Sequence, residues 1–350
     1  MLIDSARRWA NARRTDGDTA QDWRDMATLG WLGLGIPEDD GGLGGGLPEQ
    51  ALVAEELGRA LRSAPYVPCA VLGAGLMVQL APAPLRASAL PALVAGERRV
   101  AWVWRADGQD RCRSASGVVA QDDAGGWRLD GMLGLTPGAD DADTLLVAGV
   151  PGQRPDECGL FLIECDQPGV TVDRHALYDG RQAASVVLNG VRAQLLHAGD
   201  SAALGGALDQ AFDRGLIAHA AETLGTAQAA YEITLDYVRT RRQFGRAIGQ
   251  NQVVQHRLVD LYVDLHETRA LCLRAATDPS PRQVAALGLR LAEVARHTWQ
   301  EAIQLHGAIG MTEECRLGAH VRRLALAADL YGDRPEHAER LAALSLKEPA

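Results

Sequence analysis

Three long candidate helices lie in the C-terminal part of the chain, and this feature constrains the fold most. They span residues 216–238, 253–276 and 281–306. Residues 278–281 (DPSP) separate the last two, because proline cannot continue a helix. Long helices joined by short breaks are typical of an antiparallel bundle. We therefore expect a C-terminal four-helix bundle over residues 198–350.

The N-terminal part also has a helical pattern. Residues 51–61 carry apolar side chains at helical spacing and contain no proline. The glycine-rich run 41–46 lacks the lysine of a phosphate-binding P-loop, so we interpret it as a turn before that helix. These observations predict an N-terminal helical domain over residues 1–98.

The middle of the chain, residues 99–197, has a different texture. Short apolar and β-branched runs such as 144–148 and 159–163 alternate with turn dipeptides such as Asn189-Gly190. Several short strands with this punctuation predict a small β-barrel or sandwich. The expected fold is therefore α+β, with a central β domain between two helical domains.

Composition excludes some classes of function. The chain has 350 residues, of which 47% are hydrophobic and 23% are charged, a globular composition that is long enough to bury a large core. The net charge of −10 argues against a broad nucleic-acid interface, which needs basic surface. No uninterrupted apolar run approaches the roughly 20 residues that span a bilayer, and no signal peptide is recognisable.

The cysteine pattern favours a reducing compartment. Six cysteines are scattered over the chain, and none forms a CxxC pair. We interpret them as free thiols and expect a cytoplasmic protein without a metal site.

Three segments together carry a resemblance to a known family. They are residues 30–44 (GWLGLGIPEDDGGLG), 237–252 (YVRTRRQFGRAIGQNQ) and 304–312 (QLHGAIGMT). The first leads into a helix that ends in Glu-Glu-Leu-Gly at residues 55–58. In this order and at these separations, the segments resemble acyl-CoA dehydrogenases over nearly the whole chain.

The resemblance implies a tetrameric flavoprotein that binds FAD. In the family, an Arg-x-x-Phe-Gly stretch and a Gln-x-x-Gly-Gly turn contact the ADP half of an FAD held mainly by a neighbouring subunit. Arginine matches a pyrophosphate with a fork of donors, and glutamine can donate to and accept from ribose or adenine. The matching candidates for cofactor binding are Arg241, Gln243, Phe244, Gln252, Gln304, Gly307 and Ala308.

The family's catalytic base has no counterpart in this sequence. Most members carry a glutamate in a Tyr-Glu-Gly-Thr stretch, and here Gly332 follows Tyr331 at that place. A minority place the base on the helix before Arg-x-x-Phe-Gly, and counting back from the motif leads to Gly215. Glycine has no side chain, so neither position can supply a base. The nearby acids are Asp213, Glu222 and Asp333, and we interpret them as solvated or capping residues.

The flavin side also departs from the family pattern. The Thr-Glu-Pro-x-x-Gly-Ser-Asp loop expected after the first strand, residues 100–104, is replaced by residues 105–108 (RADG). A Trp-x-Thr stretch is replaced by Gly134-Leu135-Thr136, which keeps only the threonine. The elements on the ADP side are thus kept, whereas those around the flavin ring and the base are lost.

This asymmetry favours one functional hypothesis over two others. The first is a subunit of a heterotetramer whose partner, a second acyl-CoA dehydrogenase-like chain, supplies the glutamate that dehydrogenates an acyl-CoA thioester. The second is a self-sufficient homotetramer with a displaced base, Asp333 or Asp213. The third is a non-redox hydratase or binding subunit on the same fold. The resemblance further implies a role in fatty acid or lipid metabolism, with an electron-transfer flavoprotein or similar acceptor.

Overall fold

The computed structural model describes residues 2–12, 18–104, 117–123, 126–151, 157–312 and 314–347. The chain divides into two compact units. Unit 1 comprises Met1–Gly17, Leu47–Arg62 and Leu216–Ala350, and unit 2 comprises Asp18–Gly46 and Ser63–Gly215. The division into domains at residues 98 and 197 stays a prediction.

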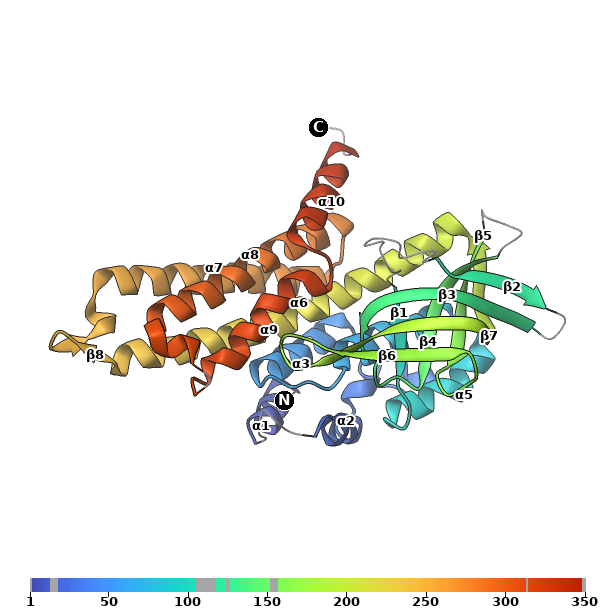
Figure 1. The fold of residues 1–350 in the computed structure, drawn as a ribbon, viewed down its shortest axis with the longest axis horizontal. Coiled ribbons are helices and arrows are strands. Elements are labelled where there is room, and N and C mark those ends of the chain that lie inside the picture. Colours follow the sequence, from blue (N-terminus) through green and yellow to red (C-terminus); the bar gives the residue numbers. More distant parts are fainter. Residues whose placement is uncertain are drawn as a thin grey trace. The chain divides into compact units, whose positions relative to one another are not determined.

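Unit 2 is built around a mixed β-sheet (Figure 1). Its strands in the described residues are β1 (Val100–Val103), β2 (Val119–Asp123), β3 (Gly126–Pro137), β4 (Thr144–Pro151), β5 (Glu157–Glu164), β6 (Val170–Ala176) and β7 (Gln182–Asp200).

The strand pairing of unit 2 closes a ring. Strands β2, β3, β7, β5 and β4 pair successively in antiparallel fashion, and β4 returns to β2 through a parallel pairing. Strand β1 adds to β4 in parallel, and β6 adds to β7. Closure leaves the ring without free edges, so the predicted small barrel is confirmed.

Short helices complete unit 2. They are α2 (Thr19–Thr28), α4 (Ala74–Leu80), α5 (Ala83–Val94), the 3-10 turns η1 (Trp31–Gly33) and η2 (Glu38–Asp40), and the π-helix η3 (Tyr66–Gly73). The predicted glycine-rich turn is confirmed, because Gly41 (φ 86°) and Gly44 (φ 63°) both adopt left-handed backbone there.

Unit 1 is helical. It contains α1 (Leu2–Asn11), α3 (Leu47–Arg59), α7 (Gln252–Thr277), α8 (Pro281–His306), α9 (Leu317–Leu330), α10 (Arg334–Lys347), the C-terminal part of α6 (Ser201–Thr240), and the 3-10 turns η4 (Ile248–Gln250) and η5 (Gly307–Met311). Helix α8 packs against α7, α9 and α10 (Figure 1). The predicted order of helices, β-sheet and helical bundle is therefore confirmed, with α10 as a helix beyond the expected four.

The bounds of α8 follow from its end residues. Ser280 caps the N-terminus, where its side chain accepts a hydrogen bond from the backbone N of Gln283 at 3.3 Å, and Pro281 occupies the first turn. Gly307 ends the helix with φ 66°.

The Glu-Glu-Leu-Gly motif has a structural role in unit 1. A Cβ on Gly58 would lie 1.8 Å from the carbonyl oxygen of Glu222, so only glycine lets α3 approach α6 this closely. The Thr226 hydroxyl donates to the Gly58 carbonyl at 3.0 Å. Around this contact, Glu56 pairs with Arg7, and Glu55 pairs with Arg269. The motif thus joins the N-terminal helices to the bundle.

Two sequence predictions concern cysteines and membranes. In the described part of the chain, Cys69, Cys158, Cys165, Cys272 and Cys315 are all free thiols, as predicted. Of the helices that the structure describes, none combines the length and apolar character that a bilayer crossing requires.

Candidate cofactor site and base positions

The Arg-x-x-Phe-Gly stretch forms a tight hairpin at one end of unit 1. Strand β8 (Arg242–Gln243) pairs with β9 (Arg246–Ala247), leaving Phe244 and Gly245 as the connecting residues. Both connecting residues have positive φ, 50° and 81°, as a type I′ turn requires. Glycine adopts this conformation freely, whereas Phe244 holds it at a cost of about 1–3 kcal/mol.

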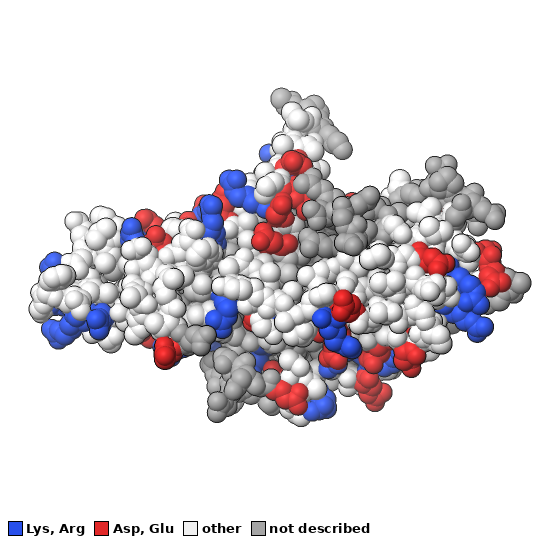
Figure 2. Space-filling view, viewed as in Figure 1, with Lys and Arg blue, Asp and Glu red and all other residues white. Residues whose placement is uncertain are grey.

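Phe244 has no packing partner that would explain this strain within the described chain. Its side chain is 100% exposed. Arg241, Arg242 and Gln243 beside it are also exposed, and Gln252 begins α7 with an exposed side chain. In Figure 2 basic side chains gather at the end of unit 1 where β8 lies. The hairpin therefore presents an apolar ring among cationic and amide groups.

The second predicted segment lies beside the hairpin's base. Tyr237, in the last turns of α6, stacks on His306 at the end of α8 with ring centroids 4.3 Å apart and planes 17° from parallel. The Tyr237 hydroxyl donates to the His306 carbonyl at 3.3 Å. Gln304, Gly307 and Ala308 next to His306 are exposed. The structure thus brings the two segments to the same end of the bundle.

The Tyr237–His306 pair was not among the predicted site residues, although both lie within the segments that carried the resemblance. Burial lowers the pKa of His306, while a hydrogen bond to the Ala302 carbonyl, 2.8 Å from Nδ1, acts in the opposite direction. Because a carbonyl only accepts, Nδ1 carries a proton. The buried imidazole is therefore held at the end of α8 by its hydrogen bond to Ala302 and its stacking on Tyr237.

The flavin-ring side can be assessed at Thr136. This residue is 0% exposed, and its hydroxyl donates to the Gly134 carbonyl at 3.1 Å. The surviving threonine is therefore already engaged inside unit 2. The replaced loop at residues 105–108 lies outside the described residues.

The base position at Gly215 is filled by another side chain. A Cβ on Gly215 would lie 2.6 Å from Cδ2 of Leu72, and the Cγ and Cδ1 atoms of Leu72 are also within 2.9 Å of it. Leu72 is 1% exposed on η3. The glycine therefore makes room for a buried leucine.

The base position at Gly332 is also unsuited to a glutamate. Its φ is +97°, a backbone conformation that side chains other than glycine rarely adopt. A Cβ there would lie 3.0 Å from Cε1 and Nε2 of His337. At both predicted base positions, a side chain of the same unit lies against the place where a Cβ would be.

The three nearby acids have different environments. The Asp333 carboxylate accepts a hydrogen bond from the backbone N of Glu336 at 2.8 Å, which makes it the N-cap of α10. Glu222 pairs with the buried Arg323 at 3.2 Å and lies 3.6 Å from His219. Asp213 is buried on α6. The capping interpretation is confirmed for Asp333, whereas Glu222 and Asp213 are not solvated.

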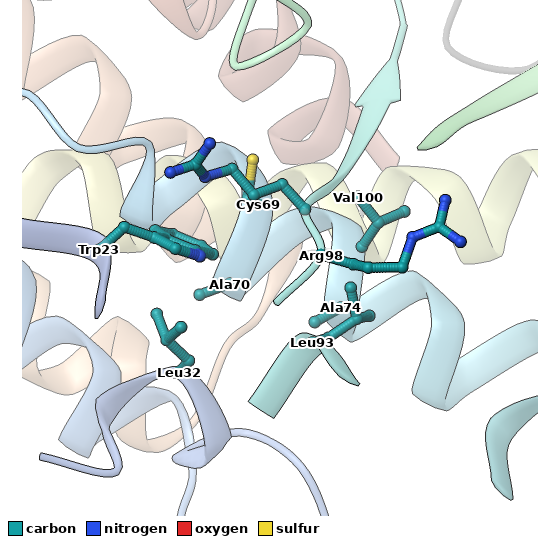
Figure 3. A pocket seen from close by; sticks show the side chains of 9 residues that line it. Trp23, Leu32, Cys69, Ala70, Ala74, Leu93, Arg98 and Val100 are labelled. Atoms are coloured by element: carbon teal, nitrogen blue, oxygen red, sulfur yellow. The ribbon is translucent and has the colours of Figure 1, made fainter. Parts of the chain in front are cut away.

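Unit 2 contains a small pocket near its N-terminal helices, which Figure 3 shows. Trp23, Cys69 and Val100 are among the residues that line it. Its volume of about 10 Å³ is comparable with the room that one water molecule needs. This space is therefore too small for an acyl chain or a nucleotide.

Comparison with known proteins decides the family. The acyl-CoA dehydrogenase N-terminal domain model matches residues 1–97, and the C-terminal domain model matches residues 206–336. The chain belongs to the acyl-CoA dehydrogenase family. Members of this family are oxidoreductases that act on CH–CH bonds.

Curated relatives cover most of this acyl-CoA dehydrogenase family chain. Acyl-CoA dehydrogenase FadE27 of Mycobacterium tuberculosis is 28% identical over 83% of this chain and 78% of its own length. A 3-sulfinopropanoyl-CoA desulfinase of Paraburkholderia xenovorans is 26% identical over 92% of this chain and 89% of its own length.

Solved structures of the family share the fold. A variant of the Tcur3481–Tcur3483 steroid ACAD has a TM-score of 0.87 at 27% identity, covering 99% of this chain and 97% of that one. The ChsE4–ChsE5 complex of Mycobacterium tuberculosis has a TM-score of 0.86 at 24% identity, covering 100% and 95%. PigA with FAD and proline has a TM-score of 0.88 at 23% identity, covering 99% and 97%.

Proposed function

We propose that this acyl-CoA dehydrogenase family chain is the base-lacking subunit of a heterotetramer. It would complete the ADP side of an FAD site, while a partner subunit supplies the catalytic glutamate for α,β-dehydrogenation of an acyl-CoA thioester. The observation that carries the proposal is the glycine at both base positions, with Leu72 and His337 in the space that a side chain there would need.

The exposed end of unit 1 fits the ADP half of FAD. Arg241 would supply charge-assisted donors to a pyrophosphate, and Gln243 would donate to or accept from ribose or adenine. A cofactor or a second subunit lying on Phe244 would cover an aromatic ring that this chain leaves 100% exposed. Gln252, Gln304, Gly307 and Ala308 are the further candidates for this surface. When bound, FAD supplies the hydride acceptor.

The bundle also presents an apolar surface suited to a partner subunit. On α7, Val253 is 63% exposed, Val259 58%, Val263 54% and Tyr262 48%. Val259, Tyr262 and Val263 lie within about 100° of one another around the helix axis, and exposed apolar side chains that share a face in this way mark surfaces that assemblies bury. Two solved relatives have paired names, Tcur3481–Tcur3483 and ChsE4–ChsE5, and the second is described as a complex. Both observations support assembly with a second family member.

A proton acceptor is needed because the α-proton of a thioester is weakly acidic. Loss of a positioned general base typically reduces the rate by roughly 10²–10⁴-fold. Asp333 is engaged as a helix cap, which disfavours it as a displaced base. The partner is therefore the better source of the carboxylate, and an electron-transfer flavoprotein or similar acceptor would reoxidise the flavin.

A second candidate is a non-redox reaction on an acyl-CoA thioester. It is favoured by the 26% identical relative that is named a 3-sulfinopropanoyl-CoA desulfinase rather than a dehydrogenase. A site without the family's base is compatible with desulfination: the C–S bond breaks with release of SO2, which water takes up as sulfite, and the electron pair left on carbon takes up a proton, so that no α-proton is removed.

The visible spectrum of the purified protein tests the proposal. The chain would be purified alone and after co-expression with a glutamate-bearing family member from an adjacent reading frame. We expect flavin absorbance only in the co-purified complex. Flavin bound by the chain alone would contradict the proposal in favour of a self-sufficient enzyme, and no flavin in either sample would favour the non-redox candidate.

A further inference from the structure

His337, the fourth residue of α10, lies between two glycines of unit 1. A Cβ on Gly288, in α8, would be 2.6 Å from each of the Cε1, Nδ1 and Nε2 atoms of its imidazole. A Cβ on Gly332 would be 3.0 Å from Cε1 and Nε2 of the same ring. The imidazole therefore lies flat on the Gly288 backbone and directs its Cε1–Nε2 edge toward position 332.

The imidazole is part of the core rather than a surface group. His337 is 2% exposed. Side chains in protein interiors are packed closely enough that even one added carbon must displace a neighbour. With the ring in this place, the first carbon of a side chain at position 332 would already be in tight contact with His337.

Two further features of the turn oppose a carboxylate at position 332. The left-handed φ of +97° at Gly332 disfavours any L side chain. Oε2 of Glu336 lies 3.2 Å from the place where a Cβ would be. An aspartate or glutamate at position 332 would therefore place its negative charge close to that of Glu336, and the two carboxylates would repel each other.

We propose that the His337 ring occupies the space beside position 332, so that this chain cannot carry a proton acceptor there and depends on its partner subunit for one. The inference rests on the proposed function, in which the partner carries the glutamate. It adds that Gly332, Gly288 and His337 form one packing unit, in which Gly288 makes the room that the imidazole occupies.

Substitution of Gly288 by alanine gives a sharp test. Inside a helix this change normally raises stability, whereas the contact with His337 should make it lower stability here. Gly288 has no left-handed φ and lies inside α8, where alanine is intrinsically favoured over glycine. In the full-length chain we expect Gly288→Ala to lower the melting temperature by several degrees. In the His337→Ala background the same substitution should raise it by roughly 1–3 °C.

Gly206 provides the matched control. It lies in α6, has nothing within 4 Å of its added Cβ, and is exposed. Gly206→Ala should raise the melting temperature by a similar small amount in both backgrounds. Gly332→Ala should destabilise the chain both with and without His337, because the left-handed backbone at residue 332 disfavours alanine in either case. The loss should be smaller once His337 is replaced, because the contact with the ring is then absent.

Two results would overturn the proposal. One is an effect of Gly288→Ala that keeps the same sign and size with and without His337. The other is thioester dehydrogenation by the chain alone that His337→Gln abolishes, since the imidazole would then be the base itself. The melting experiment needs neither flavin nor partner, so its failure is distinguishable from a failure of the proposed heterotetramer.

Discussion

The carboxylate of Asp333 accepts a hydrogen bond from the backbone N of Glu336, 2.8 Å away, at the first turn of α10. This contact assigns the acid to a helix end, where its side chain satisfies a backbone donor that the helix itself leaves unpaired.

The Asp333 contact gives the first prediction. Asp333→Asn should leave both stability and the turnover of the assembled complex nearly unchanged, because asparagine caps helices as well as aspartate does. Asp333→Ala should lower the free energy of unfolding by about 0.5–2 kcal/mol. Chemical denaturation and thioester turnover would check this. A large loss of turnover in Asp333→Asn without a loss of stability would contradict the capping role and support a displaced base.

Gly215 gives the second prediction, in unit 2. In an open helical position, Gly→Ala stabilises by about 1 kcal/mol. Here the added carbon would lie 2.6 Å from Leu72, so we expect Gly215→Ala to destabilise by about 1–3 kcal/mol.

Replacing the neighbour supplies the control for Gly215. In a Leu72→Ala background, Gly215→Ala should recover part of the stability lost to the leucine cavity, which would appear as non-additivity in a double-mutant cycle. Additive effects in urea denaturation would mean that Leu72 does not fill the space at position 215.

The sequence predicted the large elements of the fold well, because their signals are local. Helix α8 spans Pro281–His306 as predicted, since Ser280, Pro281 and Gly307 mark its ends by their own chemistry. Helix α6 begins at Ser201, well before the expected residue 216. A glycine pair at residues 205–206 weakens the local helical signal there, and tertiary packing overrides it.

The state of the two base positions could not be predicted from the sequence. The sequence shows that positions 215 and 332 lack a side chain, but it does not show which other side chains occupy the space there. Leu72 is distant from Gly215 along the chain, and His337 reaches position 332 only because Gly288 on another helix leaves room. Such compensation depends on tertiary packing, which no local pattern records.

The third prediction concerns Arg241 and FAD retention. Arg241→Ala should weaken cofactor binding in the assembled complex by about 1.5–3 kcal/mol, because it removes a charge-assisted contact to pyrophosphate. Flavin absorbance after dialysis would measure the loss. Arg8→Ala, at an exposed arginine on α1, is the control and should retain flavin. Unchanged flavin content in Arg241→Ala would reject the role of this residue.

The fourth prediction concerns acid stability and His320. Burial, with smaller contributions from the nearby Arg323 and Arg316, lowers the pKa of His320 to about 4 from an ordinary value of about 6.5. Between these pH values the unfolded chain binds a proton that the folded chain does not, so this group makes stability fall as pH falls. From pH 6.5 to pH 4, His320 should thereby lower the free energy of unfolding by about 2–3 kcal/mol.

His320→Gln should remove this contribution. The free energy of unfolding, measured by urea denaturation at several pH values, should then fall less steeply than that of the unsubstituted chain between pH about 6.5 and about 4. Parallel curves for the two proteins would show that His320 does not titrate differently on folding.

The most direct measurement of the central claim is acyl-CoA thioester turnover, with an artificial electron acceptor, by the chain alone, by its complex with a glutamate-bearing partner, and by the same complex with that glutamate changed to glutamine. We predict turnover only in the intact complex, a loss of roughly 10²-fold or more when the partner's glutamate is changed, and little effect of Asp213→Asn or Asp333→Asn in this chain. Turnover by the chain alone, abolished by either aspartate substitution, would contradict the account.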